Sequence, residues 1–158
     1  MDAIGRLCPP LRVGERVTLR LGKPTRDLIG FVVALRPLTI EDRHGRLHEI
    51  PDGTVQAARR VSPALGRDPG TAPRELLDDL ARRAGLTGEP RLHRISDLLA
   101  GRPAPATVFA ARGDWADGSH RARVEGEWLT TDVTEPELLV DLCWWATRQN
   151  ARSVQVRG

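Results

Sequence analysis

The fold of the first third of the chain is decided by residues 13–61, which read VGERVTLRLGKPTRDLIGFVVALRPLTIEDRHGRLHEIPDGTVQAARRV. Val17, Leu19 and Leu21 alternate with polar neighbours, which is typical of a half-buried strand. Further short apolar runs, each bounded by turn residues, lie at 28–35, 38–42, 47–50 and 55–61. Five such short strands cannot bury two sheets against each other, so we expect them to close into a small barrel.

Two glycines mark bends that such a barrel needs. Gly30 interrupts the apolar run 28–35, where a barrel strand would bend sharply. Gly45 lies in the turn 43–46, where a positive φ suits a hairpin. His44 and His48 flank this turn, and two histidines without a third ligand favour an exposed turn over a metal site.

A linker with two helices is predicted after the barrel, which we assign to residues 10–63. Residues 62–73 contain three prolines and two glycines, which indicates a module boundary. Within the segment 64–104 we expect one helix that Thr71 caps and Gly85 ends, and a second helix over 92–100.

The last segment, residues 105–158, predicts a β-β-α-β unit. Its expected strands are 106–112, 121–133 and 153–156, and Asp117-Gly118 indicates a hairpin turn between the first two. Thr134 can cap the helix, and Pro136 suits its first turn. The last strand should run parallel to an earlier one, because the helix acts as a crossover. The predicted fold class is therefore α+β.

Charge does not favour nucleic-acid binding. The net charge is +3, and 23 of the 24 basic residues are arginine. Residues 1–63 carry 11 basic and 7 acidic side chains (+4), residues 64–104 carry 7 and 6 (+1), and residues 105–158 carry 6 and 8 (−2). Any phosphate-seeking surface is therefore expected in the first third, where the excess is modest.

Location and redox state follow from what the sequence lacks. No apolar run approaches the roughly 20 residues of a membrane span, so we expect no membrane contact. The first residues do not have the basic and apolar regions of a secretory signal. Cys8 and Cys143 form no metal-binding spacing, and two free thiols fit a reducing compartment. We therefore expect a cytoplasmic protein.

Two parts of the chain resemble a known family. The first part resembles the N-terminal SH3-like domain that precedes a GNAT-type acetyltransferase domain in some actinobacterial proteins. The resemblance lies in residues 13–17, 29–30, 38–40, 50–51 and 57–61. Residues 138–146 and 150–156 are similar to the helix and strand that follow the acyl-CoA loop of the GNAT domain. The resemblance implies an SH3-like β-barrel followed by a degenerate half of a GNAT domain.

The functional expectation depends on where the chain departs from that family. A GNAT binds the CoA pyrophosphate at a glycine-rich turn before this helix. Here residues 131–136 contain no glycine, Pro136 lacks an N–H, and Glu135 and Glu137 would face a phosphate. The chain also has no tyrosine, which many GNATs use as general acid. We therefore expect a non-catalytic protein-binding or scaffold protein without a cofactor, with a protein partner or self-association.

Two other functions remain open. One is an acyl-CoA-dependent N-acetyltransferase of GNAT type, completed by oligomerisation. The other is weak nucleic-acid binding by the barrel.

Five residues are candidates for these roles. Glu125 and Glu127 lie where GNATs keep a general base, but pairing with Arg121 and Arg123 on the same strand face explains them as well. Trp144 and Trp145 are adjacent on the predicted helix, so one can face the core while Trp144 faces a partner. The last barrel strand presents the other two partner-binding candidates, Arg59 and Arg60.

Overall fold

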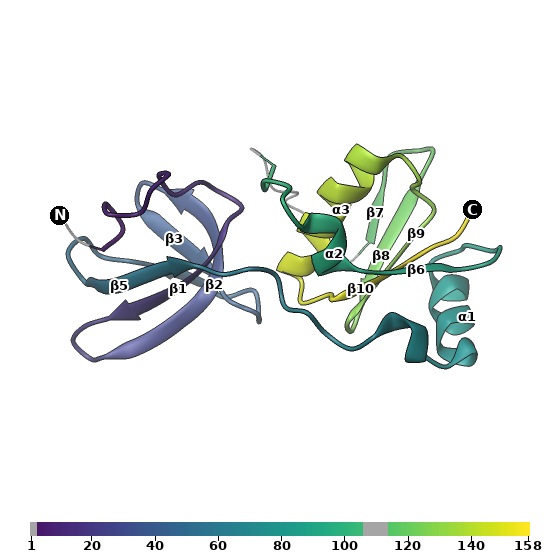
Figure 1. Cartoon of the computed structure of the whole chain (residues 1–158), viewed down its shortest axis with the longest axis horizontal. Coiled ribbons are helices and arrows are strands. Elements are labelled where there is room, and N and C mark those ends of the chain that lie inside the picture. The colour runs from purple at the N-terminus through teal and green to yellow at the C-terminus, as the bar shows by residue number, and fades with distance from the viewer. Residues whose placement is uncertain (1–2, 106–113) are drawn as a thin grey trace. The chain divides into compact units, whose positions relative to one another are not determined.

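The residues that the structure describes have an α+β fold with two five-stranded sheets (Figure 1). The structure is a computed structural model and describes residues 3–105 and 114–158. The described residues form two compact units: residues 3–62 with 104–105, and residues 63–103 with 114–158. Each unit contains one sheet and its own buried core.

The N-terminal unit is an antiparallel sheet with the strand order β4-β3-β2-β1-β5. Its strands are β1 (Arg16–Leu21), β2 (Arg26–Leu35), β3 (Leu38–Glu41), β4 (Leu47–Glu49) and β5 (Val55–Arg60). The five predicted strands are therefore present. The predicted closure into a barrel is not shown, because no hydrogen-bonded pair within residues 3–105 joins β4 to β5.

Close backbone approach explains the glycine in β2. A Cβ atom at Gly30 would lie 2.2 Å from the backbone oxygen of Glu41 in β3, so no other residue fits there. One face of the sheet is buried, and the alternating apolar residues of β1 point towards it. The core of this unit includes Val17, Leu19, Leu21, Leu28, Val32, Ile40, Ile50 and Val55.

The C-terminal unit is built on a mixed sheet with the order β6-β10-β9-β8-β7. Its elements are η1 (Pro69–Thr71), α1 (Arg74–Arg83), β6 (Arg91–Arg94), α2 (Ile95–Leu99), β7 (Asp114–Ala116), β8 (Arg121–Glu125), β9 (Trp128–Thr131), α3 (Pro136–Arg148) and β10 (Ser153–Val156). Strand β10 is parallel to β9, with Val154 opposite Leu129. Helix α3 is thus the crossover that the sequence predicts, and the other strand pairs are antiparallel.

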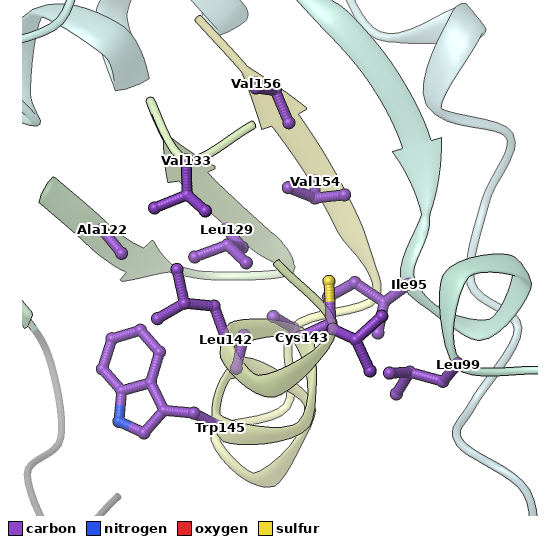
Figure 2. Close-up of a cluster of buried hydrophobic side chains, with 13 residues drawn as sticks. Ile95, Leu99, Ala122, Leu129, Val133, Leu142, Cys143, Trp145, Val154 and Val156 are labelled. Carbon is purple, nitrogen blue, oxygen red and sulfur yellow. The ribbon is translucent and has the colours of Figure 1, made fainter. Parts of the chain in front are cut away.

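One face of this sheet packs against α3 and α2. Figure 2 shows Leu142, Cys143 and Trp145 of α3 beside Leu129, Val133 and Val154, with Ile95 and Leu99 of α2 in the same cluster. Trp145 is only 1% exposed. Burying a side chain of this size contributes about 3 kcal/mol or more to stability.

The opposite face packs against α1. Gln155 points away from the α3 side because it alternates with Val154 and Val156 along β10. Its side-chain nitrogen donates to the Leu77 oxygen of α1 at 3.0 Å and to Oγ1 of Thr130 at 3.2 Å. The sheet is therefore covered by helices on both faces.

Several local predictions for this unit are wrong. Residues 91–94, expected in part to be helix, form edge strand β6, because they pair with β10. The strand expected over 121–133 is a hairpin, since Gly126 adopts φ +59° and turns the chain between β8 and β9. The expected first strand, 106–112, lies outside the described residues.

The predicted helix caps also differ from the structure. Helix α1 has Pro73 as its N-cap, and the preceding turn is capped by Asp68, whose side chain accepts from the Gly70 N–H. Helix α3 has Glu135 rather than Thr134 at its N-cap, without a side-chain hydrogen bond. Pro136 does occupy the first turn, as predicted. Among the described residues, no helix has the length and apolar character that a membrane span requires.

Candidate functional site

The C-terminal unit contains a cleft of about 410 Å³ between the end of α1 and the strands β7 and β8. Four of its nine lining residues are arginines, two from the last turn of α1 and two from β8. We call it the arginine cleft and define it by its lining residues: Arg82, Arg83, Ala84, Gly85, Trp115, Ala116, Arg121, Ala122 and Arg123.

The geometry of the cleft depends on the glycine that ends α1. Gly85 has φ +74°, a conformation that glycine adopts without strain. A Cβ atom at Gly85 would lie 2.4 Å from Nη1 of Arg121, so the guanidinium occupies the space that a side chain would take. The helix end and strand β8 therefore approach closely enough for arginines from both to line one cavity.

The two arginines on the α1 side form ion pairs with carboxylates nearby. Arg83 Nε lies 2.9 Å from Oε2 of Glu125, and Arg82 Nη2 lies 2.8 Å from Oδ1 of Asp79. Neither carboxylate lines the cleft.

On the β8 side, Arg123 shares a carboxylate with Arg83. Arg123 Nε lies 3.5 Å from the same Glu125 oxygen that Arg83 contacts. The side chain of Arg121 makes no ion pair in the described part of the chain, although its backbone N–H donates to Asp132 at 2.8 Å. The carboxylates of Glu125, Asp79 and Asp132 therefore all lie close to these arginines.

The rest of the lining is apolar. Trp115 is half-buried, packs against the C-terminal core and lies beside three alanines of the lining. The cleft can thus bind an anion at its arginines and an apolar group along Trp115. Guanidinium groups suit phosphate and carboxylate oxygens because they present paired N–H donors.

The described residues that line the cleft include no cysteine, serine, histidine or carboxylate. Burial raises the pKa of the Cys143 thiol to about 12, so this cysteine is protonated at neutral pH. Within residues 3–105 and 114–158, no three His, Cys, Asp or Glu side chains are grouped so as to hold a metal ion.

The two glutamates predicted as weak catalytic candidates, Glu125 and Glu127, have different surroundings and different ion-pair partners. Glu125 is on β8 and pairs with Arg123, one of the two arginines predicted as its partners. It also pairs with Arg83. Glu127 is not on the strand but in the β8–β9 turn, where its carboxylate lies 3.7 Å from Nη1 of Arg152. The structure does not bring the two carboxylates to one pocket.

The predicted partner-binding residues differ in their exposure and in their hydrogen bonds within the chain. Arg60 donates to Glu15 at 3.0 Å and also to the Pro9 oxygen, whereas Arg59 is exposed on β5. Trp144 is half-buried and packs against the C-terminal core, and its indole nitrogen is buried without a hydrogen-bond partner among the described residues. Partner contact through these residues stays a prediction.

The arginine cleft itself was not predicted. Arg121 and Arg123 are expected from the sequence only as partners of the glutamates, and the sequence predicts no role for Arg82 or Arg83. The available signal was the pair of alternating arginines on β8, together with a glycine that ends a helix.

Comparison with other proteins does not assign a family. No family model matches the sequence, and no curated protein or solved structure is significantly similar to it.

Proposed function

We propose that this chain is a non-catalytic binding protein and that its arginine cleft docks an anionic group of a partner protein. The observation that carries the proposal is the Arg121 guanidinium, which lines the cleft without an ion pair in the described residues and stands over Gly85. A charged side chain placed in this way is available to a ligand, because it gives up no internal partner on binding.

The N-terminal sheet is part of the same proposal, as an SH3-like module. Its strand order, β4-β3-β2-β1-β5, and the close approach at Gly30 support this assignment. The exposed side chain of Arg59 on β5 offers it a contact of its own. We propose that the C-terminal unit resembles a degenerate half of a GNAT domain, which the β8-β9-α3-β10 order supports.

The acyl-CoA alternative has less support. The first turn of α3 contains Pro136, which has no N–H to donate, and Glu137, which pairs with Arg102. Both features disfavour a phosphate at this helix end.

A peptide titration tests the proposal. A fluorescein-labelled ten-residue Glu-Gly peptide and its Gln-Gly counterpart are titrated with the full chain at low salt, and anisotropy is recorded. We expect the acidic peptide alone to bind, and Arg121→Gln to weaken it about tenfold through the lost charge-assisted hydrogen bonds.

Arg91→Gln is the matched control, because Arg91 is exposed on β6, at the other edge of the same sheet, and the substitution removes the same charge. It should leave binding unchanged. If both variants bind equally well, the attraction is a general effect of net charge and the proposal is wrong.

A further inference from the structure

We infer that the C-terminal unit has a second binding site, a small pocket that takes an apolar α-amino acid as a zwitterion. The pocket has a volume of about 270 Å³ and is lined by η1, the first turn of α1, the β8–β9 turn and the first residues of β9 and β10. It shares no lining residue with the arginine cleft and is therefore independent of the proposed function. We call it the Ser153 pocket; its lining includes Arg67, Asp68, Leu76, Glu127, Trp128 and Ser153.

Trp128 and Ser153 are neighbours in this pocket. They are opposite each other in the parallel pair of β9 and β10. Two residues further along the same strands, Thr130 and Gln155 meet on the face that α1 covers, where Gln155 donates to the Leu77 oxygen. Because side chains alternate along a strand, Trp128 and Ser153 point to that same face. They lie beside the start of α1, and the pocket is the space between them and this helix end.

The hydroxyl of Ser153 has no partner within the described residues. Ser153 is only 5% exposed, and its side chain makes no hydrogen bond in the described part of the chain. The hydroxyl is not one of the described polar atoms that are sealed from the surface without a partner, so it opens into the pocket. A hydroxyl buried in this way needs a hydrogen-bond partner, because desolvation without one costs free energy. That partner has to come from a molecule in the pocket.

The walls beside Ser153 are apolar. Trp128 is half-buried, and Leu76 is 39% exposed although it belongs to a helix that packs on the sheet. Pro69 and Pro73 complete this part of the lining. Apolar surface around a concave pocket favours an apolar ligand group, whose binding removes both surfaces from water. The volume lies below the roughly 300–1,000 Å³ that is typical of drug-sized ligands, so it suits a ligand of amino-acid size.

Charged groups of both signs line the same pocket. Arg67 makes no ion pair in the part of the chain that the structure describes. Glu127 lies 3.7 Å from Nη1 of Arg152, farther than the distance of about 2.7–2.9 Å in a charge-assisted hydrogen bond. Asp68 is used within η1, where its Oδ1 accepts from the Gly70 N–H at 2.9 Å. One guanidinium and one carboxylate are therefore available to a ligand.

The charges of the lining balance. Arg67 and Arg152 carry two positive charges, and Asp68 and Glu127 carry two negative charges. Arg94 is opposite Ser153 on β6 but does not line the pocket. A ligand with a carboxylate alone would meet two carboxylates without offering them a cation, and a ligand with an amine alone would meet two guanidinium groups. A zwitterion satisfies both signs, and an α-amino acid is a zwitterion at neutral pH.

An α-amino acid with an apolar side chain can use each part of the pocket. Its carboxylate accepts hydrogen bonds from Arg67 and from the Ser153 hydroxyl. Its ammonium donates to Glu127. Its side chain lies along Trp128 and Leu76. Every group that lacks a partner in the described chain is then satisfied by one small ligand.

Isothermal titration calorimetry of the full chain with four probes tests this inference. The probes are L-leucine, N-acetyl-L-leucine, L-leucinamide and glycine, at pH 6.5, where free α-amino groups are protonated. N-acetyl-leucine keeps only the carboxylate, like the C-terminus of a peptide, and leucinamide keeps only the ammonium, like its N-terminus. Glycine keeps both charges without the side chain. We expect leucine to bind at least tenfold more tightly than the other three.

Two variants at exposed positions assign the two ends of the ligand. Arg67→Gln should weaken leucine and N-acetyl-leucine about tenfold but not leucinamide. Glu127→Gln should weaken leucine and leucinamide about tenfold but not N-acetyl-leucine. The matched controls are Arg91→Gln on β6 and Glu135→Gln at the start of α3, which remove the same charges at exposed positions outside the pocket. Both controls should leave the affinity for every probe unchanged.

The outcomes separate this pocket from the arginine cleft. Leucine that fails to bind at millimolar concentration, or that binds the two pocket variants as tightly as the two controls, would overturn the inference. N-acetyl-leucine or leucinamide that binds as tightly as leucine would overturn the zwitterion, because one charge would then suffice. Ser153→Ala should weaken leucine several-fold and leave binding of the acidic Glu-Gly peptide unchanged, so either site can fail without the other.

Discussion

Nη2 of Arg157 lies 2.9 Å from Oδ1 of Asp78, so the chain just beyond β10 is tied to the middle of helix α1. Arg157 is only 4% exposed, and its other nitrogens donate to Gln155 at 2.9 Å and to the Gly88 oxygen at 2.8 Å. Together with Arg74, it holds the pKa of Asp78 below its usual range. This network fixes α1 on the sheet and thereby positions the arginine cleft.

Replacing this arginine should destabilise the C-terminal unit. Arg157→Met removes all three donors and leaves the buried Gln155 oxygen without its partner, which we expect to cost about 3 kcal/mol. Urea unfolding followed by circular dichroism measures the change. Arg91→Met, at an exposed position on β6, should shift stability by less than about 0.5 kcal/mol. Equal losses in both variants would show that the network contributes nothing specific.

Much of the strand pattern could be predicted from local sequence. The alternation of Val17, Leu19 and Leu21 predicts β1 because burial on one face of a strand is periodic. The crossover to β10 follows from a helix between two short strands. Edge strand β6 could not be predicted in this way, because residues 91–94 are extended only through their pairing with β10.

The arginine cleft could not be predicted from the net charge of each segment. Its arginines come from the segments 64–104 and 105–158, whose net charges are +1 and −2, so neither segment appears basic. The positive surface exists only because α1 docks against the sheet. That docking depends on contacts such as Gln155 with Leu77, which join residues far apart in the sequence.

Acid should weaken the β3–β4 hairpin through Asp42. The hydrogen bond from His48 Nε2, at 2.9 Å, and the backbone N–H groups of Arg46 and His44 lower the Asp42 pKa to about 2. Since this pKa lies below the unfolded value of about 3.9, the stabilisation is fully present above pH 4 and is lost as the pH falls towards 2.

Thermal unfolding of Asp42→Asn at several pH values checks this. The variant should melt below the wild type at pH 6, and the difference should shrink as the pH approaches 2. Asp52→Asn, at an exposed turn position, is the control and should show no such pH dependence. A difference that stays constant down to pH 2 would contradict the role of Asp42.

The two adjacent tryptophans of α3 should respond differently to truncation. Trp145→Ala leaves a cavity in the core and should cost about 3–5 kcal/mol. Trp144→Ala affects a half-buried side chain, so the protein should stay folded. If Trp144 contacts a second copy, the variant should elute as a smaller species in size-exclusion chromatography with light scattering.

Leu65→Ala, which removes a side chain that is 58% exposed, controls for a general loss of surface apolar area. A wild type that is monomeric at high concentration and is unchanged by Trp144→Ala would refute self-association through this residue.

Substitution of Gly85 should lower the ligand affinity of the arginine cleft while the protein stays folded. Gly85→Ala places a Cβ atom 2.4 Å from the present position of Arg121 Nη1, so the guanidinium must shift from that position. The positive φ of +74° adds backbone strain of roughly 1–2 kcal/mol for alanine. We expect the affinity for the acidic Glu-Gly peptide to fall several-fold, in step with the displacement of Arg121.

Gly101→Ala separates the strain from the displacement. Gly101 has a similar φ of +69°, and no atom lies within 4 Å of its added Cβ, so it carries the strain without a clash. Both variants should therefore lose comparable stability in urea, but only Gly85→Ala should weaken binding of the acidic Glu-Gly peptide, as measured by anisotropy. Because the guanidinium is the flexible end of a long side chain, the loss should be partial and smaller than that of Arg121→Gln. If Gly101→Ala weakens binding to the same extent, the effect comes from general destabilisation, and Arg121 is not held over Gly85 for the ligand.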